Sequence, residues 1–195
     1  MPLEFIFLGV IVITMLMYFN LKCVKNWFVI LGIVLVMMGY FIGEINVKNI
    51  SINVAILIGL LLICVTLFIG INRKNRAIAI VLSIGFSMLY LAVNFVSVDY
   101  NMFFTIIPIC VTLYLSHFFV RSINSQIFTV LFAAIICDIL NMFLMVEYID
   151  YWALFSHNLI VCIVLCTLPI LVEWIIRKLF LKIKENKAKK LKNAE

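Results

Sequence analysis

Seven long apolar runs, separated by short polar stretches, account for most of the 195-residue chain. Each run is about 17 to 25 residues long, and a helix of that length spans the roughly 30 Å hydrocarbon core of a bilayer. The pattern therefore predicts an all-α membrane protein with seven transmembrane helices. The expected spans are Leu3 to Leu21, Trp27 to Gly43, Ile52 to Ile71, Ala77 to Ser97, Met102 to Val120, Ile127 to Val146 and Trp152 to Ile176.

The basic residues predict the orientation of these spans. Of the 15 Lys and Arg residues, 14 lie in the first, third and fifth loops and in the tail, which leaves only Lys48 on the other side. Because Lys and Arg accumulate on the cytoplasmic side, we expect the N-terminus outside and the C-terminus inside. The net charge of +6 is then a feature of membrane orientation, and no nucleic-acid partner is expected.

The spans are expected to form one transmembrane domain over residues 1–176, followed by a basic cytoplasmic tail over residues 177–195. The first span has no positive leading region and no small-residue cleavage site, so it is interpreted as a retained span. The start of the tail can continue as an amphipathic helix on anionic lipids of the inner surface, and the residues beyond Lys184 are expected to be disordered. The predicted lipid-contacting residues are Arg177, Lys178, Lys182 and Lys184.

Asp138 lies near the middle of the sixth span. An aspartate at that depth costs roughly 3 kcal/mol on insertion scales, which the many Leu, Ile, Phe and Val residues of the span can offset at about 0.3 to 0.6 kcal/mol each. The small and polar residues Ala134, Cys137, Asp138 and Asn141 share one helix face because they are spaced three or four positions apart. We expect this face to look into protein.

Polar side chains concentrate in the last four spans, residues 77–176. Spans four and six run outward and span seven runs inward, so several of these side chains share the outer half of the membrane. Their convergence in depth predicts an outward-facing polar pocket for a small molecule or a proton. Its expected residues are Asn94, Asp138, Asn141, His157 and Asn158.

Simpler interpretations stay open for the same residues. A protonated Asp138 that hydrogen-bonds Asn94 or Asn158 would only fix helix packing, and a contact with a partner helix is a third possibility. His117 can reach the inner interface without binding anything. Glu173 and Arg177, four residues apart, are expected to form an ion pair, and the spacing of Gly39 and Gly43 favours close helix packing.

The chain lacks the sequence motifs of the common enzyme classes. It has no HExxH, GxSxG, P-loop or glycine-rich nucleotide turn, and the seventh span has no lysine for a retinal Schiff base. Five of the six cysteines lie within apolar spans and are interpreted as small apolar residues, and no metal or cofactor is expected. The sequence predicts a non-enzymatic protein.

The order of features from Ile71 to Arg177 resembles the YphA-type family of small multi-pass proteins of spore-forming Gram-positive bacteria. The shared features are the basic turn Asn72 to Arg76, the aromatic-rich span after it, the run Phe103 to Phe119 and the acid-bearing segment Ala133 to Leu140. The resemblance implies a bacterial plasma-membrane protein and carries no catalytic residues across.

The segment Ala134 to Leu140 is also similar to a helix of the rod-shape protein MreD, and more loosely to substrate-binding subunits of energy-coupling-factor vitamin transporters. Those subunits usually have six spans, and their small-residue coupling motif is absent from Leu3 to Leu21. The alternatives to a pocket protein are therefore a membrane scaffold with a membrane-protein partner and a transporter subunit.

Overall fold

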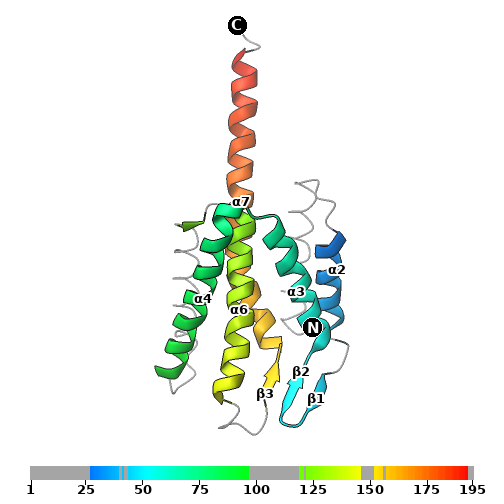
Figure 1. Ribbon diagram of the computed structural model, residues 1–195. Helices are drawn as coiled ribbons and strands as arrows, with labels where there is room; N and C mark the ends of the chain where they lie inside the picture. Colours follow the sequence, from blue (N-terminus) through cyan, green and yellow to red (C-terminus); the bar gives the residue numbers. More distant parts are fainter. Residues whose placement is uncertain are drawn as a thin grey trace.

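The computed structural model describes residues 27–39, 41, 44–96, 119–120, 122–145, 152–155 and 157–192. Helices hold 82% of these residues, which confirms the expected helical class. The expected spans Leu3 to Leu21 and Met102 to Val120 lie outside the described residues, apart from Phe119 and Val120. The elements, labelled in Figure 1, are α2 (Trp27–Met38), β1 (Ile45–Val47), β2 (Ile50–Ile52), α3 (Val54–Ile69), α4 (Arg73–Val96), α6 (Ile123–Met145), β3 (Trp152–Leu154) and α7 (His157–Lys192).

Helix α6 is the centre of the bundle, because it contacts α3, α4 and α7 (Figure 1). Its side chains Ile127, Leu131 and Ile135 belong to the buried core. Of the helices in the described part of the chain, it is also the one that is long and apolar enough, over Ile123–Leu144, to cross a membrane. Helices α2 and α3 are apolar but have only 12 and 16 residues.

Helices α2 and α3 cross at a pair of glycines. A Cβ on Gly59 would stand 2.6 Å from the Gly32 carbonyl oxygen, and a Cβ on Gly32 would stand 2.8 Å from the Gly59 carbonyl oxygen. Both distances are too short for a methyl group, so the two backbones touch directly, as small residues allow in apolar surroundings. The sequence predicts close packing at Gly39 and Gly43. Gly39, which follows α2, also lies directly against Ile56 of α3, so that a Cβ there would clash, and Gly43 lies outside the described residues.

Helices α4 and α6 pack through small and hydroxyl side chains. Ser83 Oγ of α4 shares its hydrogen between the carbonyl of Ala79, at 2.7 Å, and the carbonyl of Thr129 on α6, at 3.2 Å. Ser83, Ser87 and Thr129 are all buried. Ser83, one of the polar residues in the last four expected spans, therefore serves contact between helices.

A three-stranded sheet closes the end of the bundle opposite the C-terminus (Figure 1). Strands β1 and β2 form an antiparallel hairpin, and β2 pairs in parallel with β3, with Ile50 opposite Trp152. The sequence predicts no strand here, because strands of three residues give no pattern long enough to recognise. Lys48, in the hairpin turn, has φ 55°, a left-handed value that non-glycine residues rarely adopt.

The seventh helix begins later than the sequence predicted. Trp152 was expected to open span seven, but Trp152–Leu154 form β3, and α7 starts at His157. The left-handed φ of 55° at Phe155 ends the strand and turns the chain into the helix. Backbone groups expected to bond within a helix instead pair with β2.

The same helix also ends later than predicted. Disorder was expected beyond Lys184, but α7 runs without a break to Lys192 and extends past the other helices (Figure 1). The cause is composition, since the segment after Pro169 lacks Gly and Pro and is rich in Leu, Lys and Ile. The apolar side chains of this segment lie on several sides of the helix. The segment therefore lacks the single apolar stripe of a helix that lies along a membrane surface.

Candidate functional site

The polar face of α6 is directed at the bundle and at the turn before α7. Cys137 is buried and Asp138 is partly buried. The amide Nδ2 of Asn141 donates to Cys137 Sγ at 3.4 Å, a contact within the helix itself. The expectation that this face looks into protein agrees with these positions.

The carboxylate of Asp138 binds the backbone of the turn that follows β3. Its Oδ2 accepts a hydrogen bond from the backbone N–H of Phe155 at 2.8 Å. Phe155 is buried, so this donor would otherwise be costly to leave unpaired. The partner is therefore a main-chain group, where the sequence had suggested the side chains of Asn94 or Asn158.

The structure places Asp138 near the start of α7. Phe155, which Asp138 contacts, is two residues before His157, so Asp138 lies beside the first turn of α7, where His157 and Asn158 begin the helix. Asn94 lies in the last turn of α4, which packs on α6. The side chains of Asn94, His157 and Asn158 lie outside what the structure describes.

A second polar cluster, which the sequence analysis did not single out, joins the sheet to α2 and α3. The Oδ1 of Asn53 accepts from the Ile56 N–H at 3.1 Å and caps α3, while its Nδ2 donates to the Gly39 carbonyl at 2.7 Å. Its backbone N–H donates to the Leu154 carbonyl at 3.3 Å. An Asn directly before an apolar run is a recognisable helix-start signal, which could have revealed part of this cluster.

At the opposite end of the bundle, Arg76 closes α3. Its Nε donates to the Ile71 carbonyl and its Nη2 to the Ile69 carbonyl, both at 3.0 Å. The guanidinium also lies 5.1 Å from the ring centroid of Phe68, which packs on Phe128 of α6. A cation at a helix C-terminus is electrostatically favourable. Arg76, which belongs to the basic turn used to predict the orientation, therefore also stabilises the C-terminal end of α3.

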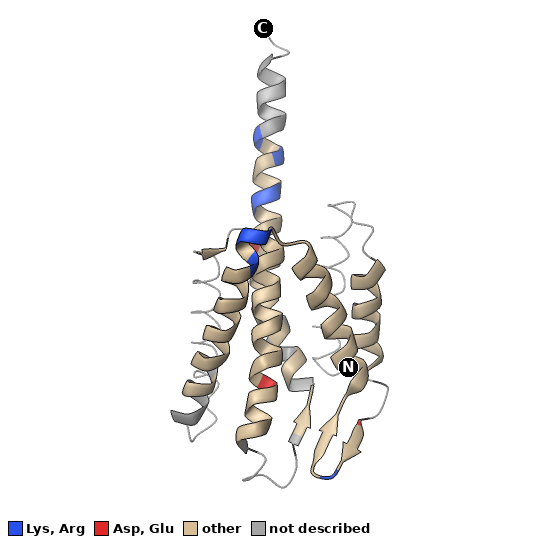
Figure 2. Ribbon diagram, in the orientation of Figure 1, with Lys and Arg blue, Asp and Glu red and all other residues tan. Residues whose placement is uncertain are grey.

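Basic residues of α7 share this end with the start of α4 (Figure 2). Arg177 Nη2 lies 2.6 Å from Glu173 Oε1, which confirms the predicted ion pair. The ammonium group of Lys178 lies 5.3 Å from the ring centroid of Trp174. The four residues predicted to contact lipid, Arg177, Lys178, Lys182 and Lys184, are all exposed.

The described residues contain no group of three His, Cys, Asp or Glu side chains that could hold a metal ion. His117, which the sequence analysis considered, lies outside the described residues. What remains at Asp138 is a carboxylate engaged with a backbone donor, an arrangement that can fix a turn or accept a polar ligand. Comparisons with protein-family models, with curated proteins and with solved structures give no match.

Proposed function

We propose that the chain is a non-enzymatic, multi-pass protein of a bacterial plasma membrane that acts as a scaffold. In this proposal it crosses the membrane seven times with its N-terminus outside and its C-terminus inside. The bundle holds the basic part of α7 in a fixed direction at the inner membrane surface, and a protein partner binds to this part of the helix. The YphA-type and MreD resemblances favour the same cellular setting.

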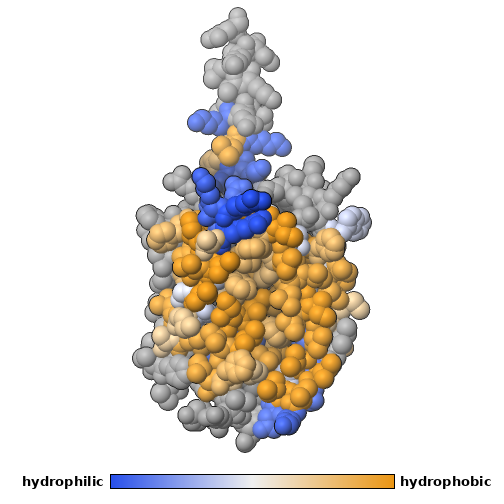
Figure 3. Space-filling model, viewed as in Figure 1, coloured by the Kyte–Doolittle hydropathy of each residue, from blue (hydrophilic) through white to orange (hydrophobic). Residues whose placement is uncertain are grey.

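A broad apolar surface supports the membrane location. The visible face carries a continuous apolar region over α3, α4 and α6 (Figure 3). Large side chains on these outer faces are exposed, for example Val81 at 68% and Val65 at 56%. Apolar surfaces of this extent are unstable in water and indicate contact with lipid or protein. Helix α4, at 24 residues, is roughly 36 Å long and so exceeds the hydrocarbon thickness.

The ends of the bundle differ in charge, which supports the proposed orientation. The start of α4, with Arg73 and Lys74, lies at the same end as the basic part of α7 (Figure 2). The β1–β2 hairpin, with Lys48 in its turn and Glu44 before it, lies at the opposite end (Figure 1). Under the positive-inside rule the α4 start faces the cytoplasm.

The observation that carries the scaffold proposal is the continuity of α7. One helix of 36 residues connects the buried core, at Ile160 and Leu171, with the basic segment beyond the bundle. A continuous helix fixes the direction of its exposed end, which a flexible tail would not do. Asp138 fits the same interpretation, because its carboxylate holds the turn from which α7 starts.

A pocket for a small molecule or a proton is the second candidate, and a transporter substrate-binding subunit would use the same pocket. It is favoured by the position of Asp138, which is only partly buried beside the first turn of α7. A polar ligand there would meet the Asp138 carboxylate and the residues that open α7. The candidate residues remain Asn94, Asp138, Asn141, His157 and Asn158.

Native mass spectra in mild detergent separate the two candidates. We would compare the wild-type chain with Asp138→Asn and with a chain that ends at Lys184. The scaffold proposal expects a co-purified protein that Asp138→Asn retains and the shortened chain loses. A small-molecule mass that is lost only from folded Asp138→Asn would contradict it and establish the pocket.

A further inference from the structure

Strand β2 buries its polar side chains and leaves its apolar ones partly exposed. Ser51 and, directly after the strand, Asn53 are buried. Ile50 and Ile52, which alternate with them, pack against the core only in part. Successive side chains of a strand point to opposite faces, so the two isoleucines share one face of the sheet. In a sheet with one face in water, the buried side chains are the apolar ones. The reversed order on β2 indicates apolar surroundings.

Strand β1 extends this apolar face to the edge of the sheet. Ile45 pairs with Ile52 and Val47 pairs with Ile50, and side chains of directly opposite residues lie on the same face. Ile45 is 56% exposed and Val47 is 55% exposed. In Figure 3 the apolar surface continues from α3 onto the hairpin and stops at a polar tip. The turn at that tip contains Lys48.

Helices α2 and α3, which the hairpin connects, are too short to cross a bilayer by themselves. At 1.5 Å per residue, the 12 residues of α2 extend about 18 Å and the 16 residues of α3 about 24 Å. The hydrocarbon core is roughly 30 Å thick. The hairpin therefore begins before the outer boundary of the hydrocarbon is reached.

The inner end of α3 allows this depth to be counted along the chain. Arg76, whose guanidinium binds the Ile69 carbonyl, belongs at the inner boundary because a charge is costly within hydrocarbon. From there α3 and then β2 run toward the opposite end of the bundle (Figure 1). The strand adds about 10 Å at roughly 3.3 Å per residue, which gives about 34 Å in all. The outer boundary of the hydrocarbon therefore falls within the hairpin.

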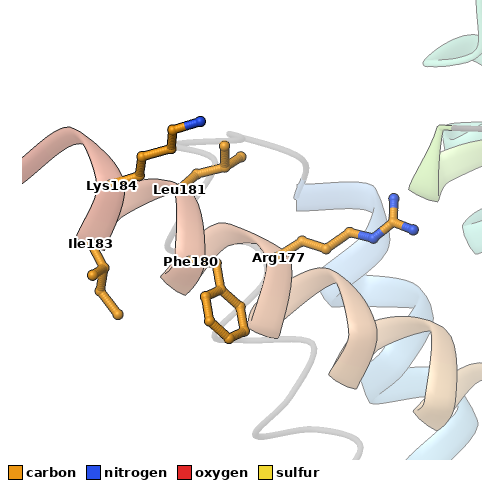
Figure 4. A pocket seen from close by; sticks show the side chains of 5 residues that line it. All are labelled: Arg177, Phe180, Leu181, Ile183 and Lys184. Atoms are coloured by element: carbon orange, nitrogen blue, oxygen red, sulfur yellow. The ribbon is translucent and has the colours of Figure 1, made fainter. Parts of the chain in front are cut away.

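The apolar side chains beyond the other end of the bundle form no comparable face. Phe180 and Leu181 of α7 point to different sides of their helix (Figure 4), and Lys182 follows them directly. Ile45 and Val47, in contrast, lie on one side of one strand. A lipid surface covers one side of an element, so the hairpin is the better match.

A second copy of the chain does not fit the edge of β1. The strands run along the bundle (Figure 1), so antiparallel pairing of two β1 strands would place the second bundle upside down. Copies in one membrane share one orientation, which excludes this arrangement. Lipid is present at this depth around the whole bundle.

We propose that the outer boundary of the bilayer crosses the β1–β2 hairpin, and that the face of Ile45 and Val47 is a contact surface for lipids of the outer leaflet. Ile45 meets the acyl chains near their glycerol ends, Val47 lies among the headgroups, and Lys48 stands on the water side. The inference rests on the membrane location proposed above. It makes the segment between the second and third expected spans a part of the membrane domain.

The test measures the surroundings of nitroxide labels on the full chain in vesicles of phosphatidylglycerol and phosphatidylcholine. In a variant without the six native cysteines, Ile45→Cys and Val47→Cys carry the label on the proposed face. Asn46→Cys is the matched control, because this exposed residue lies between them on the other face of the same strand. Val81→Cys on α4, where Val81 is 68% exposed, reports the membrane location alone.

Oxygen concentrates in hydrocarbon and a nickel chelate stays in water, so the ratio of their collision rates with the label reports lipid contact. We expect a higher ratio of oxygen to nickel collisions for Ile45→Cys and for Val47→Cys than for Asn46→Cys. Depth alone would instead place the ratio for Asn46→Cys between those of its neighbours. That result would overturn the assignment of one lipid-facing side.

Two further outcomes would overturn the inference. High nickel access at all three hairpin labels would place the hairpin in water. Low access of both reagents at Ile45→Cys and Val47→Cys would show that protein, such as a second copy, covers the face. A lipid-exposed label at Val81→Cys would keep the membrane location in each of these cases, whereas a nickel-accessible label there would overturn both proposals.

Discussion

The contact between Asp138 and Phe155 shows how one ionisable side chain in an apolar helix can serve the fold. The carboxylate satisfies a buried main-chain donor at a residue with left-handed backbone. Sequence periodicity placed Asp138 on the protein-facing side of its helix, and the structure agrees. The sequence could not identify the hydrogen-bond partner of Asp138. The backbone N–H of Phe155 requires a side-chain acceptor only because of the turn at that residue, and the sequence did not reveal this turn.

Replacing Asp138 tests whether this contact stabilises the turn. Asp138→Leu should destabilise the protein by about 1 to 3 kcal/mol, the cost of an unpaired buried donor, and should speed hydrogen exchange at the Phe155 amide. Asp138→Asn keeps a carbonyl acceptor and should stay close to wild type. Thermal unfolding in detergent and hydrogen exchange are the measurements.

Asn141→Leu is the matched control, because its bond to Cys137 stays within α6. It should leave exchange at Phe155 unchanged. Equal exchange in Asp138→Leu and wild type would mean that the carboxylate does not hold the turn.

At the scale of elements, the lengths of the apolar runs predicted helices but did not predict the sheet that connects them. The expected spans at Ile52, Ala77 and Ile127 correspond to α3, α4 and α6 with shifts of a few residues. The sheet was missed because β2 and β3 each have three residues and lie far apart in sequence. Helix α7 was predicted too short because a basic segment was interpreted as solvated tail, although Lys and Leu both favour helix.

The glycine crossing of α2 and α3 is a test at this scale. Gly59→Ala puts a methyl group 2.6 Å from the Gly32 carbonyl oxygen, so the helices must separate and the melting temperature should fall. Gly85→Ala in α4 meets nothing within 4 Å and should be neutral or stabilising by up to about 1 kcal/mol, from helix propensity. Thermal unfolding of both variants in the same detergent is the measurement, and equal shifts would argue against a close crossing.

For the whole molecule, the two charged ends make orientation measurable. In a variant without the six native cysteines, Lys48→Cys and Lys187→Cys would each carry one thiol. The proposed topology expects a membrane-impermeant maleimide to label Lys48→Cys in intact cells. It should label Lys187→Cys only after permeabilisation, and the reverse pattern would contradict the orientation.

The pairing of β2 with β3 has a consequence for how the protein is made. Ile50 and Trp152 are neighbours in the sheet although about a hundred residues separate them in the chain. Contacts between such distant segments form late, because the long intervening loop must first be ordered. During synthesis, the β1–β2 hairpin leaves the ribosome well before β3 has been synthesised. In the proposed topology both segments must also be moved to the same side of the membrane. The sheet can therefore form only when the first and last thirds of the chain have been inserted with the correct orientation.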